Sequence, residues 1–159
     1  MNDEEKIEEQ LREARERRAK RLEARETTSV LDAKRAELAK LEAEERLEEA
    51  TAKAEAEGLR LGKTLAAVPI TYADGTPLGT VLVKRPHPMH WSKFENLITE
   101  AKGVKNDQLR DELWQKSLVW PGVAEVERFQ EEQPYTRQRL TDAIALLAGF
   151  RKEEVLGKS

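Results

Sequence analysis

In the first 57 residues, apolar side chains recur at helical spacing between long runs of charged ones. Glu, Ala, Arg, Lys and Leu, which are strong helix formers, dominate this stretch, and it holds neither proline nor glycine. Two thin apolar stripes run through Ile7, Leu11, Ala14, Arg18 and Leu22 and then through Leu31, Leu38 and Leu41. The pattern predicts a charged helical arm that stops at Gly58.

The segment Thr27-Thr28-Ser29-Val30 is the weak point of this arm. Its β-branched residues depress helix propensity, and Ser29 and Asp32 can form a capping box that restarts a helix. We therefore expect either one helix bent there or two helices, near 3–26 and 30–57. Charged residues interrupt the heptads, so we expect a solvated helix, or one that pairs weakly with itself or docks on another protein.

Residues 68–83 alternate in the way that is typical of a β-hairpin. Asp74-Gly75 favours a two-residue type I′ turn, which would place Tyr72 opposite Pro77. Because Pro69 would then need a ladder hydrogen bond that it cannot donate, we expect regular pairing to begin at Ile70. Ile70, Tyr72, Val81 and Val83 would share one face, and that face needs a cover.

Four short helices are predicted between Pro88 and Gly149, separated by Gly103, by Trp120-Pro121-Gly122 and by Pro134. Asn106 or Asp107 is expected to cap the second helix and Gly149 to end the last, with Phe150 folding back on it. The predicted inward positions are Trp91, Phe94, Ile98 and Ala101; Leu109, Leu113 and Ser117; Val123, Val126 and Phe129; and Leu140, Ile144 and Leu147.

Composition separates the arm from the rest of the chain. Residues 1–57 hold 18 acidic and 13 basic residues, a net charge of −5, and all eight aromatic residues lie after them. Only the second part can therefore build a core. We expect a mainly α (α+β) protein with an arm over 1–57, a linker over 58–67, a compact hairpin-plus-helices domain over 68–150 and a polar tail over 151–159.

The residue types present limit the cellular compartments and the kinds of partner that we expect for this protein. The absence of cysteine excludes a disulfide framework and thiolate catalysis. No stretch approaches the length of a membrane span, and the acidic start lacks the apolar run of a secretory signal, so we expect a cytoplasmic protein. A local run of basic residues in the arm is flanked by acids, which argues against binding to nucleic acid.

The candidates for catalytic chemistry each have a plainer explanation. His87 and His90, with Glu95 as a possible third ligand, could approach a metal, but such a pair beside prolines is more often a loop feature. The segment 58–64 ends in Gly-Lys-Thr, yet its glycines are one residue too close for a phosphate loop and it follows a charged helix. We expect no enzyme, and no catalytic, cofactor-binding or metal-binding residues.

Three tryptophans stand in the second part, and Trp114, which lies beside a leucine stripe, is expected to face a groove. The order of motifs there is Val81-Leu82-Val83-Lys84-Arg85-Pro86, the aromatic pair Trp91 and Phe94, Leu118-Val119-Trp120-Pro121, then Phe129, Pro134 and a closing Leu140 to Gly149. This order resembles the tail assembly chaperones of long-tailed bacteriophages.

The resemblance covers about residues 68–150 and implies a helical protein that coats the tape measure protein and helps recruit tail tube subunits in the bacterial host cytoplasm. It implies no cofactor. A shielding groove would be lined by Trp91, Phe94, Leu113, Trp114, Trp120 and Phe129, for each of which core packing is the alternative. The arm is not part of the family pattern.

Two other functions stay open. The second is a structural or scaffold component of a particle, whose arm docks on a shell or on neighbouring subunits and which remains in the virion. A regulator or small enzyme unrelated to phage assembly is the third. A homo-oligomer is compatible with the first two.

Overall fold

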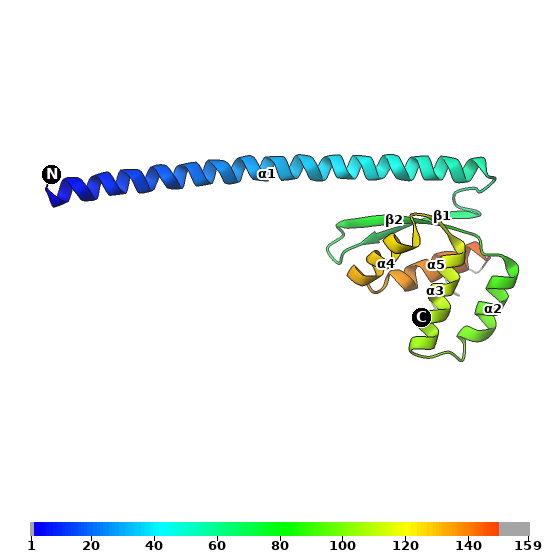
Figure 1. Ribbon diagram of the computed structural model, residues 1–159. Helices are drawn as coiled ribbons and strands as arrows, with labels where there is room; N and C mark the ends of the chain where they lie inside the picture. The colour runs from blue at the N-terminus through cyan, green and yellow to red at the C-terminus, as the bar shows by residue number, and fades with distance from the viewer. Residues whose placement is uncertain (1, 150–159) are drawn as a thin grey trace. The chain divides into compact units, whose positions relative to one another are not determined.

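The computed structural model describes residues 2–149 (Figure 1). Over this range the chain forms five helices and one three-stranded antiparallel sheet, which confirms the mainly α (α+β) class. It divides into two units, Met1–Glu44 and Glu45–Ser159. The predicted tail over 151–159 and the predicted contact of Phe150 lie outside the described residues.

Helix α1, Asp3–Ala56, runs without a break through the segment predicted to interrupt it (Figure 1). The hydroxyl groups of Thr27 and Thr28 donate to the carbonyl oxygens of Glu23 and Ala24, at 3.0 and 2.8 Å. These side chains therefore bond back to the preceding helical turn instead of capping a new helix. The expectation of two helices restarting at Ser29 is wrong.

The last turns of α1 belong to the second unit. Ala54 is buried, and with the half-buried Leu47 and Ala50 it packs against Leu65 and Leu82 of the sheet. The compact unit therefore begins inside the helix, at Glu45, rather than after the predicted linker. The helix stops where Gly58 adopts a positive φ of 97°, as expected for a glycine at a helix end.

Strands β1, Leu65–Thr71, and β2, Pro77–Lys84, form the predicted hairpin with a different turn. The amide of Tyr72 donates to the carbonyl of Thr76 at 2.8 Å, so the loop holds three residues, and Gly75 has a φ of 88°. A three-residue loop of this kind ends in a left-handed glycine and leaves a register shift beside it. The two-residue turn and the pairing of Tyr72 with Pro77 are wrong, because Thr71 faces Pro77.

Farther from the turn, the strands keep the predicted register, with Ile70 opposite Gly79 and Val68 opposite Val81. Pairing does not begin at Ile70 but continues through Pro69 to Leu65. The carbonyl of Pro69 accepts a hydrogen bond from Arg139 Nη1 at 2.8 Å. Because both backbone polar groups of a residue in an antiparallel strand point to the same side, Pro69 faces away from β2 and costs no ladder bond.

A third strand, β3, Leu118–Trp120, was not predicted. It pairs with β2, placing Leu82 opposite Trp120, and gives the sheet order β1-β2-β3. The segment Trp120-Pro121-Gly122, predicted to stop a helix, instead ends this strand, and the Trp120–Pro121 peptide is cis. β2 is thus the central strand of the sheet.

Four helices cover the face of the sheet opposite to the last turns of α1: α2, Pro88–Ile98; α3, Val104–Ser117; α4, Val123–Glu132; and α5, Thr136–Leu147 (Figure 1). Alternation along β2 separates two cores, since Val81 and Val83 face these helices while Leu82 faces α1. The predicted inward positions Leu140, Ile144 and Leu147 of α5 are buried, which confirms that stripe.

Three local expectations fail in this unit. Val123 and Tyr72 are 41% and 37% exposed and lie outside the core. Tyr72 instead donates its hydroxyl to Glu132 Oε2 at 2.5 Å. Gly103, rather than Asn106 or Asp107, is the N-cap of α3.

Candidate functional site

The six residues predicted to line a groove lie in three different places. Leu113, Trp114 and Phe129 are buried in the core between the sheet and its four helices. Trp120 is half-buried and packs with the smaller core under α1. Trp91 and Phe94, both on α2, line the larger cavity described below, and Leu113 with Phe94 also borders a much smaller one between α2 and α3.

Trp114 is completely buried, so the expectation that it faces a groove is wrong. Its indole Nε1 donates to Asp111 Oδ1 at 2.8 Å, which satisfies the polar atom of an otherwise apolar side chain. The helical pattern could not distinguish this position from an exposed one, because it lies at the edge of the leucine stripe.

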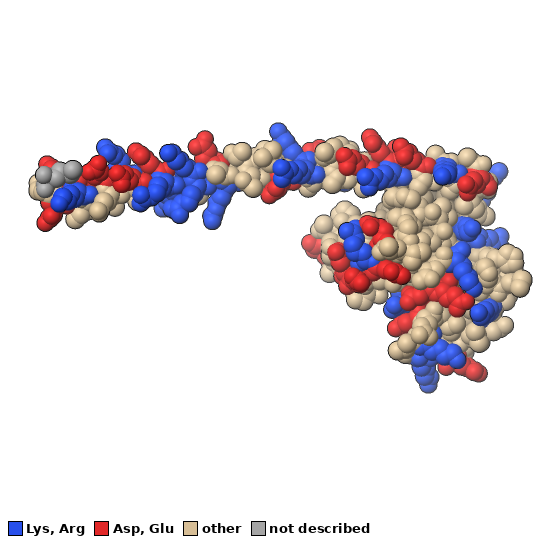
Figure 2. All heavy atoms as spheres, in the orientation of Figure 1, with Lys and Arg blue, Asp and Glu red and all other residues tan. Residues whose placement is uncertain are grey.

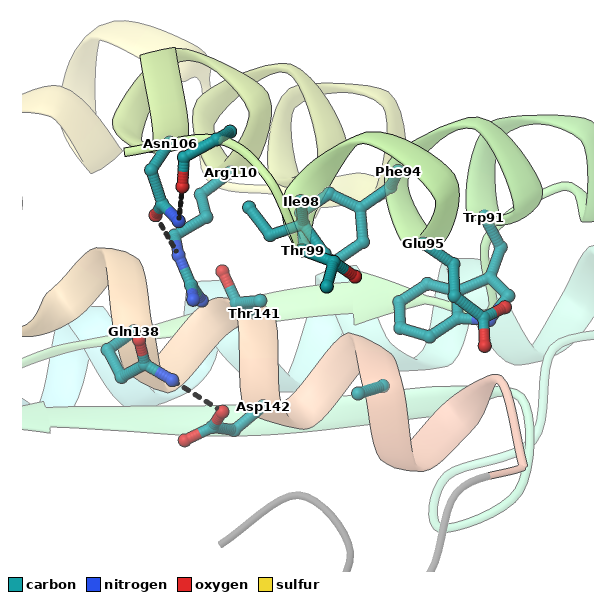
Figure 3. Close-up of a pocket in the computed structure, with 12 residues that line it drawn as sticks. Trp91, Phe94, Glu95, Ile98, Thr99, Asn106, Arg110, Gln138, Thr141 and Asp142 are labelled. Carbon is teal, nitrogen blue, oxygen red and sulfur yellow. Dashed lines mark hydrogen bonds between the residues drawn. The ribbon is translucent and has the colours of Figure 1, made fainter. Parts of the chain in front are cut away.

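The cavity lies between α2, α3 and α5 and has a volume of about 450 Å³ (Figure 3). One end is mainly apolar and the other mainly polar. The apolar end is formed by Trp91, Phe94, Ile98 and Ala145, and the polar end by Asn106, Arg110, Gln138, Thr141 and Asp142, with Ala101 beside Asn106. We refer to this cavity as the α2–α3–α5 pocket.

An aromatic pair forms the α2 side of the pocket. The rings of Trp91 and Phe94 lie 5.4 Å apart between centroids and are tilted by 36°. Phe94 is buried and anchors the pair in the core, while Trp91 is half-buried at the pocket wall. Glu95 and Thr99 are exposed and complete the rim of the pocket.

A short chain of hydrogen bonds positions the polar end. Asn106 Nδ2 donates to the carbonyl of Ala101 at 3.1 Å, and Arg110 Nε donates to Asn106 Oδ1 at 2.7 Å. On α5, Gln138 Nε2 donates to Asp142 Oδ1 at 2.7 Å. Figure 3 shows the Arg110 guanidinium extending from α3 toward α5, where Thr141 and Asp142 lie.

Burial leaves the two charged groups at the polar end of the pocket partly stripped of water. Burial lowers the pKa of the Arg110 guanidinium, and the negative charges of Asp142 and Asp107 offset only part of this decrease. It also raises the pKa of the Asp142 carboxyl above its ordinary value, against the hydrogen bond from Gln138. A ligand that offers hydrogen bonds to these two groups would recover part of the lost solvation.

The spacing of the helices around the pocket is held by Asp111, whose role the sequence did not reveal. Arg137 Nε donates to Asp111 Oδ1 at 2.8 Å, and Gln130 Nε2 donates to the same oxygen at 3.1 Å. Burial raises the pKa of this carboxyl, but hydrogen bonds from Arg137, Trp114 and Gln130 outweigh it and hold the pKa below its usual range. One carboxylate thus ties α3 to both α4 and α5.

Two of the residues considered for catalytic chemistry accept local backbone hydrogen bonds. His87 Nδ1 accepts a hydrogen bond from the amide of Met89 at 3.1 Å and so caps α2. Thr64 Oγ1 accepts from the amide of Arg60 at 2.9 Å within a turn that precedes β1. Among residues 2–149, no three His, Asp or Glu side chains lie where they could together hold a metal ion.

Helix α1 offers a second candidate surface within the unit Met1–Glu44. Figure 2 shows a dense group of Lys and Arg in its N-terminal half, and the run comprises Arg12, Arg15, Arg17, Arg18, Lys20 and Arg21. Acidic side chains flank this run, and Glu9 lies 3.9 Å from Arg12. Within the described part of the chain, no helix is both long and apolar enough to cross a membrane.

No protein-family model, curated protein or solved structure matches the chain. The α2–α3–α5 pocket and the exposed surface of α1 are therefore the two candidate functional sites.

Proposed function

We propose that the chain is an assembly protein similar to the tail assembly chaperones of long-tailed phages, acting in the bacterial host cytoplasm. Its compact unit would bind an apolar stretch of a long helical partner, the tape measure protein, before that partner is incorporated. The observation that carries this proposal is the α2–α3–α5 pocket, which combines an aromatic wall with two partly desolvated charges.

The size of the pocket suits part of a helix rather than a whole one. An amphipathic helix presents apolar side chains three and four residues apart, and a cavity of about 450 Å³ suits such side chains rather than the helix backbone. Trp91, Phe94 and Ile98 would contact those side chains. Arg110 and Asp142 would bond to polar groups on the flank of the same helix and so fix its direction.

A structural role is the second candidate, and the exposure of α1 favours it. Seven large apolar side chains of the arm are about half exposed, namely Ile7, Leu11, Leu22, Val30, Leu31, Leu38 and Leu41. A scaffold or virion component could dock this surface on a shell or on neighbouring subunits. The protein would then remain in the finished particle.

Co-expression with the tape measure protein of the same genome tests the first proposal. We expect the two proteins to co-purify and Ile98→Asp to reduce the affinity at least about tenfold, because it places a charge against the aromatic wall. Leu97→Asp is the matched control, since Leu97 is the preceding residue, is 40% exposed and does not line the pocket. Thr99→Arg, which alters the exposed rim, separates loss of binding from loss of folding.

Two results would overturn the chaperone proposal. One is a genome that encodes the chain and no tape measure protein. The other is unchanged co-purification of both Ile98→Asp and Thr99→Arg. Mass spectrometry of purified particles distinguishes the two functions, because a chaperone is absent from them and a structural component is present in fixed stoichiometry.

A further inference from the structure

An eleven-residue repeat gives α1 one continuous apolar stripe within the unit Met1–Glu44. Alternate steps of eight and three residues connect its members, which are Leu11, Ala19, Leu22, Val30, Ala33 and Leu41. Eleven residues correspond to three turns of 3.67 residues each, so these side chains stay close to one face of the helix. The stripe spans about 45 Å at 1.5 Å per residue.

Nothing in the described part of the chain covers this stripe. Its four larger members are about half exposed, from 48% for Leu22 to 54% for Val30. A helix with an apolar face of this length gains stability when a second helix buries that face.

Three charged residues lie along the same face, again eleven residues apart: Arg15, Glu26 and Glu37. Among residues 2–149, none of the three forms an ion pair. Their charges are therefore available to a helix that packs on the stripe.

We propose that residues 11–41 pair with the same residues of a second copy in an antiparallel orientation. When Leu11 faces Leu41 of the second copy, Leu22 faces Val30 and the two small side chains Ala19 and Ala33 face each other. The apolar positions then match along the whole stripe.

Charge selects the antiparallel orientation over the parallel one. In the antiparallel register Arg15 lies opposite Glu37 at two symmetry-related places, and only Glu26 meets its own copy. In a parallel dimer each of the three residues would face an identical charge. Like charges destabilise helix pairs, and opposite charges set their orientation.

This pairing goes beyond the proposed function, because it uses the arm and leaves the α2–α3–α5 pocket free. A dimer would carry two compact units, so a long partner with repeated apolar segments could be bound by both at once. The second binding step would then be intramolecular, which raises the overall affinity.

Cysteine cross-linking of the full chain tests the pairing, since the protein has no cysteine of its own. Ala19→Cys and Ala33→Cys are prepared separately, mixed and equilibrated in a glutathione redox buffer. We expect a disulfide-linked dimer from the mixture and little from either variant alone. A dimer formed by Ala19→Cys alone would indicate parallel helices and overturn the proposal, as would a mixture that stays monomeric.

A charge-reversal cycle checks the register independently. Arg15→Glu and Glu37→Arg should each weaken self-association, measured by sedimentation equilibrium, because each places like charges opposite one another. The double variant should restore association to within about twofold of the unchanged chain. A double variant no tighter than the single ones would contradict the antiparallel register.

Discussion

The phenyl ring of Phe129 on α4 lies directly over Gly79 of β2, so any side chain at position 79 would meet that ring. A Cβ atom built on Gly79 would come within 2.5 Å of Phe129 Cζ, well inside van der Waals contact. The glycine therefore lets α4 approach the central strand of the sheet. Phe129 is only 4% exposed, so its ring has little space into which it could shift.

Gly79→Ala should lower the free energy of unfolding by about 1–3 kcal/mol, because the added methyl group overpacks the core. Chemical denaturation monitored by circular dichroism measures the change. Gly122→Ala is the matched control, since nothing lies within 4 Å of its added Cβ and its φ of −68° suits alanine. Equal stability of the two variants would show that the ring does not restrict this position.

Ser117→Ala should raise the free energy of unfolding by about 1 kcal/mol. Ser117 is 1% exposed, and within the described residues its hydroxyl oxygen has no hydrogen-bond partner. Removing an unpaired buried hydroxyl removes its desolvation cost. Thermal melting measures the change, and a variant less stable than the unchanged chain would mean that the hydroxyl is paired in solution.

Asp111→Asn should lower the free energy of unfolding at pH 7 by about 1–3 kcal/mol, because the carboxylate accepts hydrogen bonds from Arg137, Trp114 and Gln130. The folded pKa lies below the unfolded value of about 3.9. The carboxylate therefore stabilises the fold above about pH 4, and this contribution is lost as the pH falls through the folded pKa. Denaturation between pH 7 and pH 2 should show the difference between the two proteins shrinking as the pH falls.

Asp142→Asn should have the opposite pH dependence. Burial raises the folded pKa of Asp142, so the unchanged chain loses stability as the pH rises through that value. Asparagine keeps an acceptor for Gln138 without the charge. The free energy of unfolding of the variant should therefore rise relative to that of the unchanged chain as the pH rises. A difference between the two proteins that stays constant from pH 3 to pH 8 would contradict the raised pKa of Asp142.

The sequence correctly predicted those helices and strands in which the spacing of apolar residues alone determines which face of the element is buried. The stripe of Leu140, Ile144 and Leu147 and the register of Val68 with Val81 are of this kind. The length of the turn at Gly75 was predicted wrongly, because Asp-Gly occurs both in two-residue turns and in three-residue turns.

Contacts between residues far apart in the sequence explain the other differences between the predicted and the observed structure. Strand β3 is three residues long and follows α3 directly, which leaves no room for an alternating pattern. The sequence around Leu47, Ala50 and Ala54 does not differ from the rest of the charged arm. Only the folded structure shows that these residues pack against Leu82. The pocket joins Arg110 to Asp142 across two helices, and their separation in sequence gives no sign of that proximity.

Site-specific photo-cross-linking tests directly the proposal that the α2–α3–α5 pocket binds the tape measure protein. A photoreactive amino acid is placed at Thr99 on the pocket rim or, as a control, at Glu127 on the exposed surface of α4. In cells that co-express the two proteins, we expect cross-links from position 99 to an apolar helical segment of the tape measure protein and none from position 127. Cross-links from position 127 alone, or equal yields at both positions, would contradict it.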